Sequence, residues 1–160
     1  MTAPGFETHD HGSCVADSLQ QAEQYCAEQR LQLTPTRRRV LEILLEGHRS
    51  MGAYEILDRL RAEGLGSQPP VAYRALDFLT MHGFAHRIEG LNAFIACTHL
   101  SDSHSPAFLI CRACNRVVEA EVDLMAGELG RAAADAGFVI ERSVREAIGL
   151  CPACAQEARA

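Results

Sequence analysis

Apolar positions recur with a helical period through the first half of the chain. The spacing i, i+3, i+4, i+7, which puts side chains on one face of a helix, is that of Ala53, Ile56, Leu57 and Leu60. Before a similar run, Thr34-Pro35 offers a capping hydroxyl and a proline suited to a first helical turn. The pattern predicts helices over about 17–30, 35–47, 53–64 and 70–82.

The period changes from helical to alternating after His82-Gly83. Phe84, His86 and Ile88 share one side of a predicted strand, residues 89–92 form a turn, and residues 93–96 return. Helices followed by such a hairpin are typical of a winged helix-turn-helix, a DNA-binding arrangement.

A polar linker over 98–106 separates this part from a second unit. There the pattern predicts a strand over 108–110, a strand over 117–122, a helix over 123–136 and a last strand from 138 to about 148. The fold class is therefore α+β. We expect a disordered start over 1–16, a winged-helix unit over 17–97, a hinge over 98–106 and a small α/β unit over 107–160.

Charge gives only weak support for a nucleic-acid partner. The chain has 160 residues and a net charge of -6, and all of its 15 basic residues are arginines. An acidic total argues against non-specific coating of nucleic acid or anionic lipid. A local cluster remains possible on the winged unit, and its candidates are Arg37, Arg38, Arg39, Arg74 and Arg87. The alternative is that these arginines are ordinary solvated residues on helix surfaces.

The cysteines indicate metal binding inside the cell. Seven is an odd count, and no apolar segment opens the chain, so a secreted disulfide framework is disfavoured. No run reaches the roughly 18 to 20 apolar residues that cross a bilayer. We expect a cytoplasmic protein.

Two C-x-x-C motifs carry the most specific signal. Cys111 and Cys114 form one, Cys151 and Cys154 the other, and 36 residues separate them. Each motif turns tightly enough to present two thiolates to one ion, and together they complete the tetrahedral shell of a structural zinc. Redox-active dithiols are the alternative.

A second, looser set of possible ligands lies around the junction of the two units. Its members are His86, Cys97, His104 and Glu119. Each alone has an ordinary explanation, such as a buried cysteine or an exposed strand carboxylate. Together they offer a tetrahedral zinc site, and the thiolate favours zinc over manganese or ferrous iron. His9, His11 and Cys14 are further metal-binding residue types, in the expected disordered start.

The chain resembles the ferric uptake regulator family of bacterial repressors over about residues 17–155. The resemblance rests on Leu33-Thr34-Pro35-Thr36-Arg37, on residues 70–79 (PVAYRALDFL) and on the C-x-x-C pairs. Segments 84–87, 94–97 and 103–111 are most similar to the zinc uptake branch of the family. One departure is Val71-Ala72, where Thr-Val is usual.

The resemblance implies a homodimeric, zinc-responsive repressor of zinc uptake genes that binds an inverted-repeat operator. Residues 107–160 would be the dimerisation domain. Each subunit would hold two zinc ions, one structural and one regulatory, at the two ligand sets above. Tyr54, Tyr73 and Arg74 would contact DNA, and Asp58 and Arg61 would pair between adjacent dimers on the operator.

Three alternatives remain. The nearest is an iron- or peroxide-responsive regulator of the same family. A zinc enzyme such as a nucleobase deaminase needs H-x-E, and no histidine here is followed two residues later by glutamate, so we expect no enzyme. A thiol redox switch built on the C-x-x-C motifs is the third.

Overall fold

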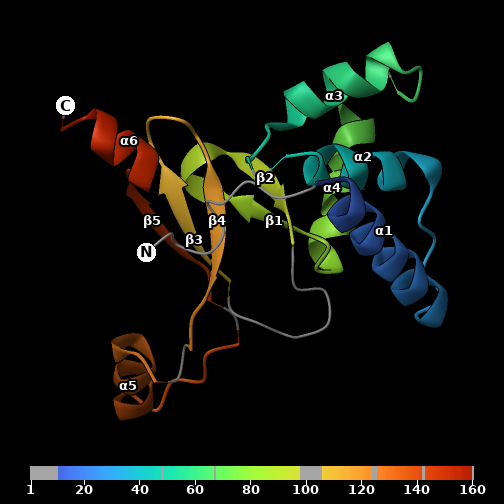
Figure 1. The fold of residues 1–160 in the computed structure, drawn as a ribbon. Coiled ribbons are helices and arrows are strands. Elements are labelled where there is room, and N and C mark those ends of the chain that lie inside the picture. The colour runs from blue at the N-terminus through green and yellow to red at the C-terminus, as the bar shows by residue number, and fades with distance from the viewer. Residues whose placement is uncertain are drawn as a thin grey trace.

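A helical part and a sheet part lie next to each other, with a small hairpin between them (Figure 1). The computed structural model describes residues 11–47, 49–66, 68–97, 106–123, 126–141 and 143–159. The helical part comes first in the chain and comprises α1 (His11–Glu28), α2 (Pro35–Leu45), α3 (Ala53–Ala62) and α4 (Pro69–Met81). The predicted α+β class and winged-helix arrangement are confirmed.

The helices form where the sequence supplies caps and one apolar stripe. The Thr34 side chain accepts a hydrogen bond from the Arg37 backbone N–H at 3.4 Å, and Pro35 follows in the first turn. The stripe predicted on α3 is its buried face. Burying these stripes against one another builds a single core beneath α2, α3 and α4.

Helix α1 begins at His11, six residues before the predicted start near residue 17. Val15, Leu19, Ala22 and Cys26 continue one apolar stripe that packs on the helical core. This packing extends the helix over a Gly-Ser stretch whose intrinsic helix propensity is low. Residues 1–10 of the predicted disordered start lie outside the described residues.

The hairpin has one face toward each part of the molecule. It comprises β1 (Ala85–Ile88), the short 3-10 helix η1 (Glu89–Leu91) and β2 (Ala93–Ala96), with His86 opposite Ile95. Phe94 packs into the helical core, whereas Ile88 and Ile95 cluster with residues of the second sheet. We call this hairpin the wing.

The second sheet has the strand order β4-β3-β5. Strand β3 (Pro106–Cys111) pairs antiparallel with β4 (Val117–Glu121) and parallel with β5 (Arg145–Gly149). The parallel pair requires a long crossover, which contains α5 (Glu128–Asp135), and α6 (Pro152–Glu157) follows β5. No helix among the described residues is long and apolar enough to cross a membrane.

Two predictions for the second unit were wrong in extent. The last strand was predicted to start at residue 138, but it starts at Arg145. Its pairing with β3 begins there, with Ala107 opposite Arg145, and ends with Cys111 opposite Gly149. Phe138 and Val139, which looked like strand residues, are 67% and 80% exposed. The helix predicted over 123–136 is the shorter α5, with residues 124–125 outside the described part, and α6 was not predicted.

Candidate metal centres

The two C-x-x-C motifs meet at one end of the second sheet. Strand β3 ends at Cys111, and a tight turn follows, in which the Asn115 N–H donates to the Cys111 carbonyl at 2.9 Å. Cys151 is the residue before α6, so the first turn of that helix brings Cys154 to the same side. The parallel pairing of β3 with β5 places the two motifs together.

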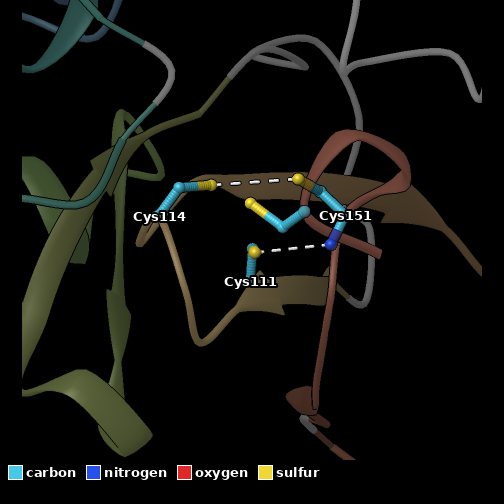
Figure 2. A group of neighbouring side chains, drawn as sticks. Cys111, Cys114 and Cys151 are labelled. Carbon is cyan, nitrogen blue, oxygen red and sulfur yellow. Dashed lines mark hydrogen bonds between the residues drawn. The ribbon is translucent and has the colours of Figure 1, made fainter. Parts of the chain in front are cut away.

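The four cysteine side chains point toward a common centre, and we call them the cysteine cluster. Their sulfur atoms all lie within 4.8 Å of one another. Cys114 Sγ lies 3.9 Å from Cys151 Sγ, and the Cys151 N–H donates to Cys111 Sγ at 3.3 Å. Figure 2 draws both interactions as dashed lines. Zinc–sulfur bonds of about 2.3 Å in a tetrahedron separate neighbouring sulfur atoms by about 3.8 Å. The observed spacing fits one zinc ion.

The acidities of these thiols also favour a cation. Hydrogen bonds from backbone N–H groups, that of Cys151 first and that of Cys114 next, lower the pKa of Cys111 to about 6. Hydrogen bonding with Cys151, burial and the other nearby thiols raise the pKa of Cys154 to about 12. One thiolate therefore forms readily, but clustered thiols resist ionising together. A divalent cation compensates their combined negative charge.

A second group of possible ligands lies where the wing meets the second sheet. His86, Cys97 and Glu119 each place a ligand atom within 4.8 Å of the other two. We call them the sensor cluster, after the regulatory role that the sequence resemblance implies for them. His86 Nε2 lies 3.5 Å from Glu119 Oε1. This is close to the separation of about 3.4 Å expected for nitrogen and oxygen ligands of one tetrahedral zinc. A thiolate, an imidazole and a carboxylate suit zinc.

Backbone pairing explains how these residues meet. His86 lies in β1, and the Cys97 N–H donates to the Phe84 carbonyl at 2.9 Å, so the wing hairpin sets their separation. Glu119 lies in β4 opposite Phe108, whose ring centroid is 5.4 Å from that of His86. The wing and the residue that follows it thus contribute two possible ligands, and the second sheet contributes one.

The fourth predicted ligand and the N-terminal residues of metal-binding types fall wholly or partly outside the described residues. His104, the predicted fourth member of the sensor cluster, lies in the segment 98–105. His9 lies before residue 11, and the side chains of His11 and Cys14 are outside the description.

The residues predicted to contact DNA lie on the surface of the helical part. Tyr54 and Tyr73 are exposed and line a cleft of about 870 Å³ between the helices and the wing, which Asp77, His86 and Arg87 also line. Arg74 is exposed on α4. The two residues predicted to pair between dimers, Asp58 and Arg61, contact each other at 3.1 Å within α3.

Four of the five clustered arginine candidates are engaged within the chain. Arg37 stacks over the Phe78 ring at 3.9 Å, and Arg87 donates to the Asn92 side chain at 3.0 Å. Arg38 pairs with Glu23 and Glu42. Arg39 bonds to Glu42, Glu46 and Glu63, and these bonds raise its pKa. Glutamates thus compensate the charges of Arg38 and Arg39, whereas no ion pair among the described residues involves Arg37 or Arg74. A shared positive surface stays a prediction.

Sequence reasoning missed one contact between the two parts. In β5, Glu146 accepts hydrogen bonds from the Glu89 N–H at 2.6 Å and the Gly90 N–H at 2.8 Å, both at the tip of the wing. The partners are 57 and 56 residues apart in the chain. No local pattern signals a contact at that separation.

Comparison with known proteins gives consistent matches. The model of the ferric uptake regulator family matches residues 28–144. The zinc uptake regulation protein of Escherichia coli (strain K12) is 39% identical over 140 residues, covering 86% of this chain and 81% of that protein. A solved zinc uptake regulator complexed with zinc and DNA superposes with a TM-score of 0.85 at 35% identity, covering 91% of this chain and 98% of that one.

Two solved forms of a further relative, XcZur, differ in how well they superpose. Both are 40% identical to this chain. The holo form has a TM-score of 0.77 and covers 88% of this chain and 98% of its own. The apo form has a TM-score of 0.51 over 89% and 99%. The chain thus superposes better on the holo form than on the apo form.

Proposed function

The chain belongs to the ferric uptake regulator family, and from this we propose that it is a zinc-responsive transcriptional repressor. It binds an inverted-repeat operator as a homodimer when zinc fills the sensor cluster, and it represses genes of zinc uptake. The observation that carries this proposal is the sensor cluster itself, a thiolate-containing ligand set that spans the wing and the second sheet. It acts in the cytoplasm, where operator DNA and reduced thiols are found.

We assign one structural and one regulatory zinc ion to each subunit. The cysteine cluster has a closed shell of thiolates, which leaves no position for a substrate, so we assign it no catalytic role. It ties β3 to the residues after β5 in a small unit whose buried apolar side chains are few. His104 is the proposed fourth ligand of the regulatory ion.

The wing connects the regulatory site to the DNA-binding helices. When bound, zinc supplies a coordination link between the wing and the second sheet. His86 and Cys97 hold the wing side of that link, and Glu119 holds the sheet side. Phe94 anchors the wing in the helical core, so a wing fixed on the second sheet also fixes the orientation of α4.

The DNA surface is formed by α4 and the neighbouring cleft. Arg74 on the exposed face of α4 is the candidate for a bidentate contact with a guanine. Tyr54 and Tyr73 present exposed hydroxyl-bearing rings at the rim of the cleft, where they would contact phosphates or thymine methyl groups.

A second copy of the chain completes the DNA-binding unit. Strand β5 lies at the edge of the sheet, and Ile148 on it is 62% exposed. Phe138 and Val139, in the segment that leads to β5, are exposed as well. An edge strand with exposed apolar side chains favours pairing with another chain, and two-fold symmetry then matches an inverted repeat. Asp58 and Arg61 are the proposed contacts between neighbouring dimers.

The arrangement of the two parts supports the regulatory assignment. It is closer to the holo than to the apo form of XcZur, as the TM-scores of 0.77 and 0.51 indicate. This likeness to a holo form supports the proposal that a bound metal joins the wing to the second sheet. Zinc is favoured over iron as the signal because Cys97 supplies a soft ligand and because the relatives above are zinc uptake regulators.

Operator binding measured against buffered free zinc tests the proposal. Zinc should promote binding at free concentrations at which iron and manganese do not. A Cys97→Ser variant should keep its dimer state and one tightly held zinc ion but lose zinc-dependent binding. Cys26→Ala is the matched control, because Cys26 is a buried cysteine of the helical core outside both clusters.

Two results would contradict the assignment. Unchanged zinc-dependent binding by Cys97→Ser would remove the sensor role from this cluster. Binding promoted by iron at lower free concentration than by zinc would favour the iron-responsive alternative.

A further inference from the structure

The tip of the wing is attached to the second sheet by one carboxylate. Glu146 Oε1 accepts from the Glu89 N–H at 2.6 Å, and Oε2 accepts from the Gly90 N–H at 2.8 Å. These two N–H groups open η1, where the residue before the turn supplies no side-chain cap. Hydrogen bonds to a carboxylate are stronger than those to a neutral acceptor, and two from one group also fix orientation.

Gly90 has no side chain, which leaves room for the Glu146 carboxylate. A Cβ atom at residue 90 would lie 2.8 Å from Glu146 Oε2 and 3.6 Å from Ile148 Cδ1. No positive φ angle is involved, so the backbone conformation does not favour glycine there. A Cβ atom would instead displace the flexible end of the Glu146 side chain. The Glu146 carboxylate and Gly90 therefore fit each other as a pair.

The rest of the interface is apolar. Ile88 and Ile95 of the wing pack with Phe108, Ile110 and Val117 of the second sheet. Such contacts favour closure, but they are not directional and tolerate sliding. The two hydrogen bonds to Glu146 supply the directional element at the tip of the wing.

The contact also joins two strands that lie next to metal clusters along the chain, β1 to the sensor cluster and β5 to the cysteine cluster. Strand β1 holds His86 three residues before Glu89, and β5 leads to Cys151 five residues after Glu146. We propose that Glu146 is a positioning residue for zinc sensing, whose carboxylate latches the wing onto β5 and thereby holds His86 at a metal-sharing distance from Glu119. This inference rests on the proposed function for its regulatory meaning, whereas the latch itself rests on the contact geometry.

The test combines variants on both sides of the latch. Glu146→Ala removes both acceptors, Glu146→Gln retains one acceptor oxygen, and Gly90→Ala displaces the carboxylate by sterics alone. Glu141→Ala is the control, because Glu141 is an exposed glutamate outside the strands and helices of the same unit. The double variant Glu146→Ala/Gly90→Ala measures whether the two changes act through one contact.

Three measurements are made on the full-length dimer. They are amide hydrogen exchange at Glu89 and Gly90, zinc affinity of the sensor cluster by chelator competition, and operator binding against free zinc. Glu146→Ala and Gly90→Ala should each speed exchange at the Glu89 amide and weaken sensor zinc affinity by about tenfold, as the loss of charge-assisted hydrogen bonds implies. Glu146→Gln should fall between wild type and Glu146→Ala, and Glu141→Ala should match wild type.

The double variant decides the mechanism. It should be no weaker than the single variants, because the second change has no contact left to break. If the losses of zinc affinity in the two single variants multiplied in the double variant, the proposed latch would be wrong. Unchanged amide exchange in Glu146→Ala would also overturn it. Faster exchange with unchanged sensor zinc affinity would show that Glu146 holds the turn without positioning the site.

The design separates this inference from the proposed function. Exchange and zinc affinity are measured without DNA, so they judge the latch even if zinc does not control operator binding. Failure of the operator assay alone, in wild type, would count against the repressor assignment and leave the positioning role supported by the other two measurements.

Discussion

Replacing Phe108 removes the largest side chain from the apolar contact between the wing and the second sheet. Phe108 is 1% exposed and packs with Ile88, Ile95, Ile110 and Val117. Truncating a buried phenylalanine to alanine typically costs about 3–5 kcal/mol of unfolding free energy. A milder change, Phe108→Leu, should cost about 1 kcal/mol and keep the protein folded.

Phe84 provides a matched control. It is equally buried, at 1% exposed, but it belongs to the core of the helices. Phe84→Leu should therefore cost a similar free energy of unfolding without loosening the contact between the two parts. Phe108→Leu should weaken the packing of the wing on the second sheet by about 1 kcal/mol. Because 1.4 kcal/mol corresponds to a factor of ten, zinc affinity at the sensor cluster should then drop about fivefold.

Two assays measure the two effects. Urea unfolding followed by circular dichroism gives the stability of each variant, and chelator competition gives zinc affinity at the sensor cluster. Both variants should lose similar stability, and only Phe108→Leu should weaken zinc binding. Equal loss of zinc affinity in Phe84→Leu and Phe108→Leu would refute the reasoning, because global stability would then explain the effect.

Three further predictions concern other parts of the molecule. Arg74→Ala should lose about 1–3 kcal/mol of discrimination against operators with a substituted guanine, measured by competition binding; equal weakening on all DNA would make Arg74 a phosphate contact. Thr34→Ala removes the cap of α2 and should lower the unfolding free energy by about 1 kcal/mol, seen as a lower urea midpoint at unchanged m-value. Stripping metal from the cysteine cluster should unfold the second sheet and dissociate the dimer, followed by circular dichroism and sedimentation; an intact metal-free dimer would exclude a structural metal.

The sequence predicts features that depend on local chemistry. The Thr34-Pro35 pair marked the start of α2, and the cap is present. The C-x-x-C spacing predicted the cysteine cluster, because four thiols in two tight turns have few other arrangements. His86, Cys97 and Glu119 lie together because the hairpin sets the separation of His86 and Cys97 and the wing packs on the second sheet.

Features that depend on distant partners were missed. Alternation around Phe138 resembled a strand, but a strand forms only where β3 offers a free edge, so β5 begins at Arg145. The contact of Glu146 with the wing has no counterpart in its local sequence. The extent of α1 depends on tertiary packing of Val15 and Leu19, which outweighs the weak propensity of the residues around them.

The pairing of α2 arginines with glutamates has a consequence for how the protein searches a genome. Arg38 and Arg39 are held by Glu23, Glu42 and Glu63. Because these charges are already compensated, the two arginines would neutralise few DNA phosphates. Each neutralised phosphate adds only about 0.9 to the slope of log affinity against log salt concentration. We therefore expect weak attraction to random DNA and a shallow dependence of affinity on ionic strength. Little of the protein would then be bound non-specifically to chromosomal DNA. Occupancy of its operator would therefore depend on the supply of metal and not on the amount of competing DNA.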